Sequence, residues 1–450
     1  MPKIYSARWV LPIADPPIEH GAIVVDDFKI VSVGRRDDTL TSFAGAVHED
    51  FGDAAILPGL INAHSHLELT VMRGFLEREE TDFFAWLRKL TGARLKMTDE
   101  DLFVSAACGA IEAARAGVTC LADSSSFALP SMRALAEVGL RATVYQESFG
   151  PDPALSGENV EKLRAQLEQM RKTQTELVRA GASPHAPYTV SAPQLEMISR
   201  LALDEHLPLM MHAAESQAEK QFLQQGAGPF AEGLKSRDIH WQAPGVSTMR
   251  YLQDHGVLET RPLLAHCINV DQDDLELIKK AGAGIAHCPK SNAKLRHGRA
   301  PFAHFIAQGI NTGLGSDSVA SNNMCDILAE ANFATLMARL SYRDDHPTSD
   351  VSASDALFAA TLGGARALGI EHSIGALRPG MQADIAIVSL AGAHQRPICD
   401  PHDALVFSTS GRDVLLTVVA GKEVYRHGRV STVDEEALAL TLRELSRRLT

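Results

Sequence analysis

Residues 98–124, TDEDLFVSAACGAIEAARAGVTCLADS, contain one complete helix and the strand that follows it. Thr98 and Asp101 have the spacing of a capping box, which satisfies free backbone N–H groups at a helix start. The amphipathic run LFVSAACGAIEAARAG follows, and Gly117 stands where a helix C-terminus is expected. Because the β-rich run VTCLADS comes directly afterwards, this stretch predicts a helix that leads into a buried strand.

The same alternation of strand and helix continues through the middle of the chain. Amphipathic helical segments separate eight short apolar runs: AAILPGLIN, VTCLADS, RATVYQE, RAGASP, LPLMMH, RPLLAHC, AGIAHCP and INTGLGSD. Eight such repeats are typical of a (β/α)8 barrel, whose parallel strands form an inner cylinder. We therefore expect an α/β fold with a TIM-like barrel over residues 58–374.

β-rich segments flank this central region on both sides. They lie within residues 4–51 and in the later runs ADIAIVSLAG and DVLLTVVAGKEVYRHGRV. Isolated strands cannot bury their apolar faces, so we predict that residues 1–57 and 375–432 pair as one small β-sandwich domain. Periodic leucines after Asp434 predict a C-terminal helix over residues 433–450.

The composition limits the classes of partner. The 450 residues include 43 Lys and Arg against 56 Asp and Glu, a net charge of −13 that disfavours nucleic-acid binding. No apolar run is long enough to cross a bilayer, and the first residues do not resemble a signal peptide. Six cysteines without C-x-x-C spacing are typical of reduced thiols. We expect a cytoplasmic protein that acts on a small molecule, without nucleic-acid or membrane partners.

Polar side chains recur at the carboxyl ends of the predicted strands, where barrel enzymes place their active sites. They are His64 and His66 in an H-x-H pair, then His185, His212, His266 and Asp317. Side chains two residues apart on a strand point the same way, so an H-x-H pair can chelate one cation. Isolated H-x-H pairs often arise by chance, but coincidence at several strand ends favours a metal site. The candidate ligands are His64, His66, His212 and Asp317, with one position open for water.

Glu215 lies three residues after His212, where the strand turns into the next helix. There its carboxylate can reach a water that the metal activates and serve as general base. The alternative is that Glu215 stabilises the first turn of that helix. The two roles are compatible.

Several motifs together resemble the amidohydrolase superfamily over nearly the whole chain: LPGLINAHSHLELTVMRG, SPHAPYTVS, HAAES, LLAHC and GLGSDSVASNN. The similarity is greatest to the branch of cytosine, S-adenosylhomocysteine and aminodeoxyfutalosine deaminases. It implies the same four metal ligands, Glu215 as proton shuttle, and His266 as the group that polarises the attacked centre. It also implies that Asp317 accepts a proton, and that the protein is a homo-oligomer.

The resemblance also implies one metal per chain. Relatives with two metals bridge them through a lysine after the fourth strand, and the corresponding stretch AGASPHAP has none. We expect a single Zn²⁺, with Fe²⁺ as the alternative because imidazole suits both ions.

The predicted substrate contacts come from four segments. In the SPHAPYTVS motif, His185 and Tyr188 resemble residues that contact substrate, although His185 could instead support a ligand. Glu68 and Arg73 follow the H-x-H pair, where Glu68 either binds a purine or ribose donor or pairs with Arg73. Further candidates are Trp86, which with Phe84 forms either an aromatic wall or a core helix, and Glu147 at the end of the third strand. Residues 226–245 either cover the pocket or form a surface excursion.

The substrate is predicted from the resemblance alone. S-adenosylhomocysteine deaminases carry a ribose-binding glutamate a few residues after the W-L pair, where this chain has KLTGARL. The motifs HLELT, SPHAPYTVS, HAAES with KQFLQQGAGPF, and CPKSNAKL are more similar to aminodeoxyfutalosine deaminases. Those enzymes remove the 6-amino group of an adenine nucleoside in menaquinone synthesis. The resemblance therefore implies a hydrolytic deaminase of 6-aminodeoxyfutalosine.

Other activities would use the same ligand set. They are deamination of S-adenosylhomocysteine, methylthioadenosine or guanine, dechlorination of a triazine, and opening of a cyclic amide. A binding scaffold without catalysis is a further alternative. The intact ligands and Glu215 argue against the scaffold.

Overall fold

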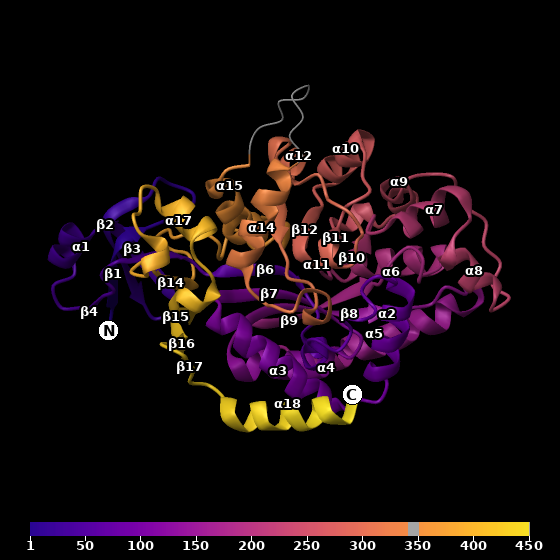
Figure 1. Cartoon of the computed structure of the whole chain (residues 1–450), viewed down its shortest axis with the longest axis horizontal. Helices are drawn as coiled ribbons and strands as arrows, with labels where there is room; N and C mark the ends of the chain where they lie inside the picture. The colour runs from indigo at the N-terminus through magenta and orange to yellow at the C-terminus, as the bar shows by residue number, and fades with distance from the viewer. Residues whose placement is uncertain (341–350, 450) are drawn as a thin grey trace.

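The computed structural model describes residues 1–340 and 351–449. Its centre is a barrel of eight parallel strands in two four-stranded sheets (Figure 1). The strands are β6 (Leu60–Ser65), β7 (Val118–Ser125), β8 (Arg141–Ser148), β9 (Val178–Pro184), β10 (Met210–Ala213), β11 (Leu263–His266), β12 (Gly284–His287) and β13 (Thr312–Leu314). Bridges from Ser65 to Asp317 and from Ala182 to Leu209 join the two sheets at both seams. The strands therefore close, and the predicted TIM-like barrel is confirmed.

Helices follow most of the barrel strands and cover the outside. They include α3 (Asp99–Arg115), α4 (Ala128–Val138), α5 (Ser156–Thr173), α6 (Ala192–Asp204), α10 (Gln272–Ala281) and α14 (Ile327–Arg339). The start of α3 has the predicted capping box, because Thr98 Oγ1 accepts from Asp101 N and Asp101 Oδ2 accepts from Thr98 N. Gly117 lies just beyond the helix with φ +80°, a conformation that favours glycine.

Further helices form the connections and the rim of the barrel. They are α1 (Arg36–Ser42), α2 (Phe83–Arg94), α7 (Gln217–Gln225), α8 (Pro229–Lys235), α9 (Thr248–Asp254), α11 (Pro289–Lys294), α12 (Phe302–Ala307), α13 (Val319–Asn322), α15 (Ala353–Phe358), α16 (Gly364–Ala367) and α17 (Pro401–Phe407). None of the described helices is both long and apolar enough to cross a membrane.

A nine-stranded sheet lies beside the barrel and is built from both ends of the chain (Figure 1). Its strands are β1 (Lys3–Val10), β2 (Ile18–Asp26), β3 (Lys29–Arg35), β4 (Val47–Asp50), β5 (Ala54–Pro58), β14 (Ile385–Ser389), β15 (Val414–Val419), β16 (Lys422–Arg426) and β17 (Arg429–Val430). β5 pairs antiparallel with β14 and joins the two halves. Ile30 N donates to Met381 O, and Ala383 N to Phe28 O, so β3 also meets the segment before β14. The sheet thus folds around its own apolar cluster, as the sequence predicted for the two termini.

One predicted strand is divided in the structure. The run AAILPGLIN forms β5 of the nine-stranded sheet and then β6 of the barrel, with Gly59 between them. A β-carbon at Gly59 would lie 2.1 Å from Thr119 Oγ1, so only glycine fits this crossing point. The chain therefore passes from one sheet to the other within a single residue.

The C-terminal helix α18 (Glu435–Leu449) lies along α3 on the outside of the barrel, as Figure 1 shows. Its apolar residues Leu442, Leu445 and Leu449 pack in one cluster with Trp86 and Leu90 of α2. The helix predicted from the periodic leucines is present. It thus shares an apolar cluster with α2, which forms one wall of the cavity described below.

Candidate active site

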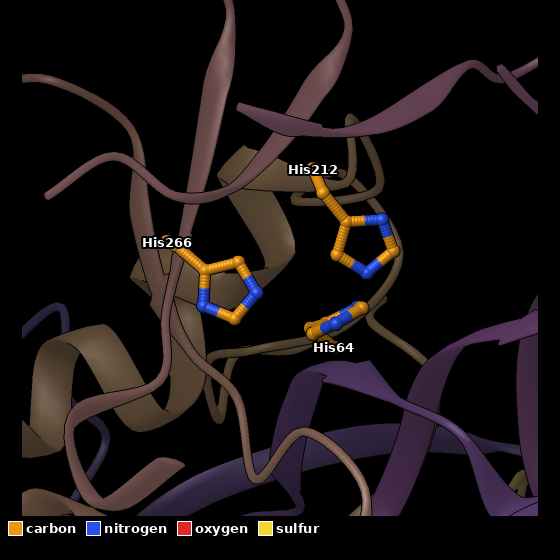
Figure 2. Close-up of side chains that lie close together, drawn as sticks. All are labelled: His64, His212 and His266. Atoms are coloured by element: carbon orange, nitrogen blue, oxygen red, sulfur yellow. The ribbon is translucent and has the colours of Figure 1, made fainter. Parts of the chain in front are cut away.

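Four barrel strands bring polar side chains together at one rim. His64 is the last residue but one of β6, and His66 directly follows that strand. His212 is the last residue but one of β10, and His266 is the last residue of β11. Figure 2 shows the imidazoles of His64, His212 and His266 turned toward one another. Asp317 lies three residues after β13 and completes the set. The convergence predicted from the strand ends is therefore present.

The spacing of the donor atoms fits a single metal ion. His66 Nε2 lies 3.3 Å from His212 Nε2 and 3.6 Å from Asp317 Oδ1, and His64 Nε2 lies 3.4 Å from Asp317 Oδ1. Ligands bound at about 2.0–2.1 Å to one tetrahedral zinc lie about 3.3 Å apart. Imidazole and carboxylate are also the donor types that suit zinc. Donor atoms of His64, His66 and Asp317 all lie within 4.8 Å of one another, and His212 forms a second such group with His64 and His266. The two groups share His64, which places the four predicted ligands beside one candidate site for a divalent ion.

Neighbouring backbone and hydroxyl groups form hydrogen bonds that orient these side chains. His212 Nδ1 is 2.9 Å from the carbonyl oxygen of His185, which leaves His212 Nε2 facing the site. Asp317 Oδ2 accepts from Ser291 Oγ at 2.5 Å and from Ser321 Oγ at 3.1 Å. Asp317 Oδ1 accepts from Ser318 N at 2.7 Å and is the oxygen that faces His64 and His66. Such partners fix the tautomer and direction of metal ligands.

The protonation states also suit metal binding. Burial lowers the pKa of His64 and of His185 to about 3, so both are neutral at pH 7. Burial raises the pKa of Asp317, but His64, His266 and His66 together outweigh this and hold the pKa well below its usual value. Both ring nitrogens of His64 are buried without a hydrogen-bond partner. A coordinated ion would satisfy one of them, and neutral imidazole is the form that binds metal.

Glu215 is buried beside this set. Its Oε1 lies 3.6 Å from His266 Nε2 and 3.5 Å from His297 Nε2, and its Oε2 accepts from the Tyr188 hydroxyl at 3.3 Å. Burial raises the pKa of Glu215, but the imidazole of His266 and then that of His297 outweigh this, and the pKa is about 2. The carboxylate is thus ionised and able to accept a proton.

The turn after β10 does not use Glu215 as a helix cap. Ser216 caps α7 by accepting from Glu219 N, and Glu219 accepts from the backbone N–H groups of Ala214 and Glu215. The Glu215 side chain is therefore free for the site. Ala214 has φ +53°, and His266 and Asp317 have φ +74° and +56°. Three residues at the ends of barrel strands thus have the left-handed backbone conformation, which is strained for residues other than glycine, and all three lie around the candidate site.

A cavity of about 460 Å³ opens onto the metal-binding side chains. Four predicted contact residues line it: Trp86, Glu147, His185 and Tyr188. His185 Nδ1 is 2.9 Å from Thr189 Oγ1. Burial raises the pKa of Glu147, but His185 and then His66 outweigh this, and the pKa is about 2. The cavity thus has an anionic wall close to the metal site.

Glu68 and Arg73 do not belong to the lining of this cavity. Glu68 is fully buried and accepts from Ser125 Oγ at 2.6 Å and from Ser126 N at 3.1 Å. Its ion-pair partner is Arg94 at 3.6 Å, whereas Arg73 pairs with Glu112. The predicted Glu68–Arg73 pair is therefore replaced by two separate ion pairs.

Segment 226–245 contributes to the roof of the cavity. Phe230 of α8 stacks on Tyr188 at 3.8 Å between ring centroids and meets Phe84 at 5.1 Å. Arg237 of the same segment lines the cavity. Of the two aromatic residues considered on α2, Trp86 faces the cavity, while Phe84 packs against the roof.

Sequence reasoning missed several residues of the site. Thr91, Arg94, Phe149 and Arg237 line the cavity, and His297 contacts Glu215. Arg94 lies within KLTGARL, the stretch noted above for its lack of an acid. His297 follows β12, so the rule that strand ends carry the active site, applied further along the loop, would have found it.

Comparison with known proteins places the chain in a family. The sequence model of the Amidohydrolase family matches residues 55–424. The chain belongs to this family. It is accordingly a hydrolase that acts on carbon–nitrogen bonds, and its rim is the site of a divalent metal.

Similar proteins extend over almost the full chain. A 5-methylthioadenosine/S-adenosylhomocysteine deaminase of Nitratidesulfovibrio vulgaris is 32% identical, covering 96% of this chain and 93% of its own length. A 5′-deoxyadenosine deaminase of Methanosarcina mazei is 30% identical, with 93% and 91% covered. A zinc-bound structure described as an adenosine deaminase of Xanthomonas campestris superposes with a TM-score of 0.85 at 26% identity, covering 99% and 98%.

Proposed function

We propose that His64, His66, His212 and Asp317 hold one zinc ion, which would supply an activated water to the cavity. The donor spacing of 3.3–3.6 Å supports a single site. The stretch after β9 that would carry a bridging lysine in a two-metal site reads HAPY. A similar structure bears zinc.

The reaction that these side chains serve is hydrolytic deamination of an adenine nucleoside. Water adds to the ring carbon that bears the amino group, and Glu215 moves the water proton to the neighbouring ring nitrogen. His266 donates to the new oxygen and stabilises its developing charge. Asp317 accepts the proton of the new hydroxyl and passes it to the amino group, which leaves as ammonia, and a 6-oxopurine nucleoside remains. The observation that carries this proposal is the ionised Glu215 beside His266, 3.6 Å away.

The lining of the cavity favours an adenine nucleoside with a carboxylate on its 5′ arm. Apolar and aromatic side chains such as Phe83, Trp86 and Phe149 would pack against the base and the arm. Arg237 offers a guanidinium group that matches a carboxylate, and Arg94 lines the same cavity while it pairs with Glu68 at 3.6 Å. S-adenosylhomocysteine and 6-aminodeoxyfutalosine both have such an arm, and methylthioadenosine does not. We propose 6-aminodeoxyfutalosine first, because KLTGARL lacks the ribose-binding acid.

An ammonia-release assay on the zinc-loaded protein tests this function. The panel contains adenosine, methylthioadenosine, S-adenosylhomocysteine, 6-aminodeoxyfutalosine, guanine, cytosine and a chlorotriazine. We expect ammonia from the adenine nucleosides, with the highest kcat/KM for the two that bear a carboxylate. Release of chloride from the triazine, or no ammonia from any adenine nucleoside at one metal per chain, would refute the proposal.

A further inference from the structure

One short segment after β12, residues 291–297, touches three functional side chains. Its contacts are Ser291 Oγ to Asp317 Oδ2 at 2.5 Å, Asn292 Oδ1 to His266 Nδ1 at 2.9 Å, and His297 Nε2 to Glu215 Oε1 at 3.5 Å. The first two contacts hold a proposed metal ligand and the group that polarises the substrate. The third concerns a histidine to which the reaction above assigns no role.

His297 is held firmly in this position. Its side chain is 6% exposed, and its backbone N–H donates to the carbonyl oxygen of Asn292 at 3.0 Å. Phe83 packs edge-on against the imidazole, with 4.7 Å between ring centroids. His297 Nε2 is buried and has no hydrogen-bond partner. A buried donor without a partner is costly, so this nitrogen needs an acceptor.

Glu215 Oε1 lies within reach of this nitrogen, 3.5 Å away, although the two atoms do not form a hydrogen bond in this structure. Burial lowers the pKa of His297, so its ring is neutral at pH 7 and carries one N–H. An ionised carboxylate only accepts, so the nitrogen that faces Glu215 Oε1 must carry the hydrogen. The separation of 3.5 Å lies at the limit of a hydrogen bond. Such bonds are often long in active sites without substrate and shorten during the reaction.

Two imidazoles face the same oxygen of Glu215. His266 Nε2 lies 3.6 Å from Oε1, but it must turn to the substrate oxygen when it polarises the attacked carbon. His297 lies beside Oε1 and does not line the cavity, so no contact with a substrate there draws it away. Tyr188 holds the other oxygen, Oε2, at 3.3 Å. When His266 turns to the substrate, Tyr188 and His297 therefore remain next to the two oxygens of the Glu215 carboxylate.

We propose that His297 is a positioning residue that holds the carboxylate of Glu215 for proton transfer. The inference rests on the proposed function, in which Glu215 carries the proton. His297 would act through Glu215, the general base, without contacting the substrate itself.

The first test compares two substitutions of His297 in the zinc-loaded enzyme. His297→Gln keeps an N–H donor at similar reach, whereas His297→Met fills the space without a donor. We expect His297→Met to lower kcat about 10- to 100-fold, as misplacement of a catalytic group does, with KM changed less than about threefold. His297→Gln should retain most of the activity. Equal kcat in the two variants would overturn the proposal.

A matched control uses a histidine–glutamate contact far from the site. His255 Nδ1 lies 2.9 Å from Glu196 Oε1, and Glu196 is largely exposed. His255→Gln should leave kcat and KM unchanged. Metal content of one per chain and an unchanged melting temperature in each variant exclude misfolding as the cause of a lower kcat.

The second test does not depend on turnover. Cobalt replaces zinc, and the pH midpoint of the change in its visible spectrum is measured for the wild type, His297→Met, Glu215→Gln and the double variant. We expect His297→Met to shift the midpoint only when Glu215 is present. An equal shift in both backgrounds, or none in either, would overturn the positioning role. If the wild type releases no ammonia from any nucleoside, the proposed function fails, and this cycle still decides the role of His297.

Discussion

Two clusters of charged and ionisable side chains differ in how they are satisfied. In the nine-stranded sheet, Arg426 donates to both Glu49 and Glu423, with distances from 2.7 to 3.0 Å, and Lys3 joins them. These side chains are 30–33% exposed. At the rim of the barrel the side chains are almost fully buried, and His64 has two ring nitrogens without a hydrogen-bond partner.

This difference indicates that the cluster in the sheet serves stability and that the cluster at the rim serves function. The network in the sheet neutralises itself at a half-exposed surface, where ion pairs contribute little. The rim holds buried polar atoms that nothing in the described chain satisfies, and such atoms lower the stability of a fold. Groups of this kind are expected where a bound ion or substrate completes them. Changes at the rim should therefore alter activity strongly, and changes in the sheet should alter stability slightly.

The largest effect is expected from loss of a metal ligand. His212→Ala removes one donor whose Nε2 lies 3.3 Å from His66 Nε2, so the remaining set should bind zinc poorly. We expect a metal content far below one per chain and no detectable ammonia release. Metal analysis after gel filtration checks this. Full metal content with normal activity would show that His212 is not a ligand.

The next largest effect is expected from Glu215→Gln. This variant keeps every proposed ligand but removes the base, so kcat should fall by about a thousandfold, within the usual range for general base catalysis. Zinc content should stay at one per chain, which distinguishes this variant from His212→Ala. Retained turnover would contradict the role of Glu215 as proton carrier.

A smaller and selective effect is expected from Arg237→Ala. Arg237 lines the cavity and makes no ion pair with a described carboxylate. Its loss should raise KM for a nucleoside with a carboxylate arm about tenfold or more, with little change in kcat. Steady-state kinetics with methylthioadenosine, which has no carboxylate, provide the control. An equal rise in KM for both substrates would contradict recognition of the arm.

The smallest effect is expected in the sheet. The hydrogen bond from Arg426 outweighs burial and holds the pKa of Glu423 at about 2. A lowered pKa stabilises the folded state above the usual carboxyl pKa, and this stabilisation is lost as pH falls toward about 2. Glu423→Gln should therefore lower the free energy of unfolding at pH 7 by about 1 kcal/mol. Near pH 2 the difference should vanish.

Denaturant unfolding at pH 7 and at low pH measures this difference. Ammonia release by Glu423→Gln should equal that of the wild type at pH 7, since the network lies outside the barrel. A large loss of activity in this variant would contradict the view that the network in the sheet affects stability and not activity.

The rim could be predicted from sequence because barrel topology fixes where strand ends meet. His64, His212 and His266 each lie within the last two residues of a barrel strand, and the active sites of such barrels are built where these strands end. The prediction depended on the existence of each strand and not on its boundaries. For this reason the division of AAILPGLIN into β5 and β6 did not disturb it.

The wall of the cavity could not be predicted in the same way. Glu68 and Arg73 lie near His66 in the chain, but the short helix at 67–72 turns Glu68 inward to Ser125 and Arg73 outward to Glu112. Arg237 reaches the cavity from a loop, where sequence periodicity says nothing about side-chain direction. Proximity in sequence is a poor guide where the chain leaves regular structure.

Titration of the metal-free protein with zinc, with ammonia release from an adenine nucleoside as the readout, tests the central claim most directly. Activity should rise linearly and reach its maximum at one equivalent per chain, with the 6-oxopurine nucleoside formed in equal amount to ammonia. Full activity without metal, a maximum at two equivalents, or no ammonia at one bound equivalent would contradict a single-metal deaminase.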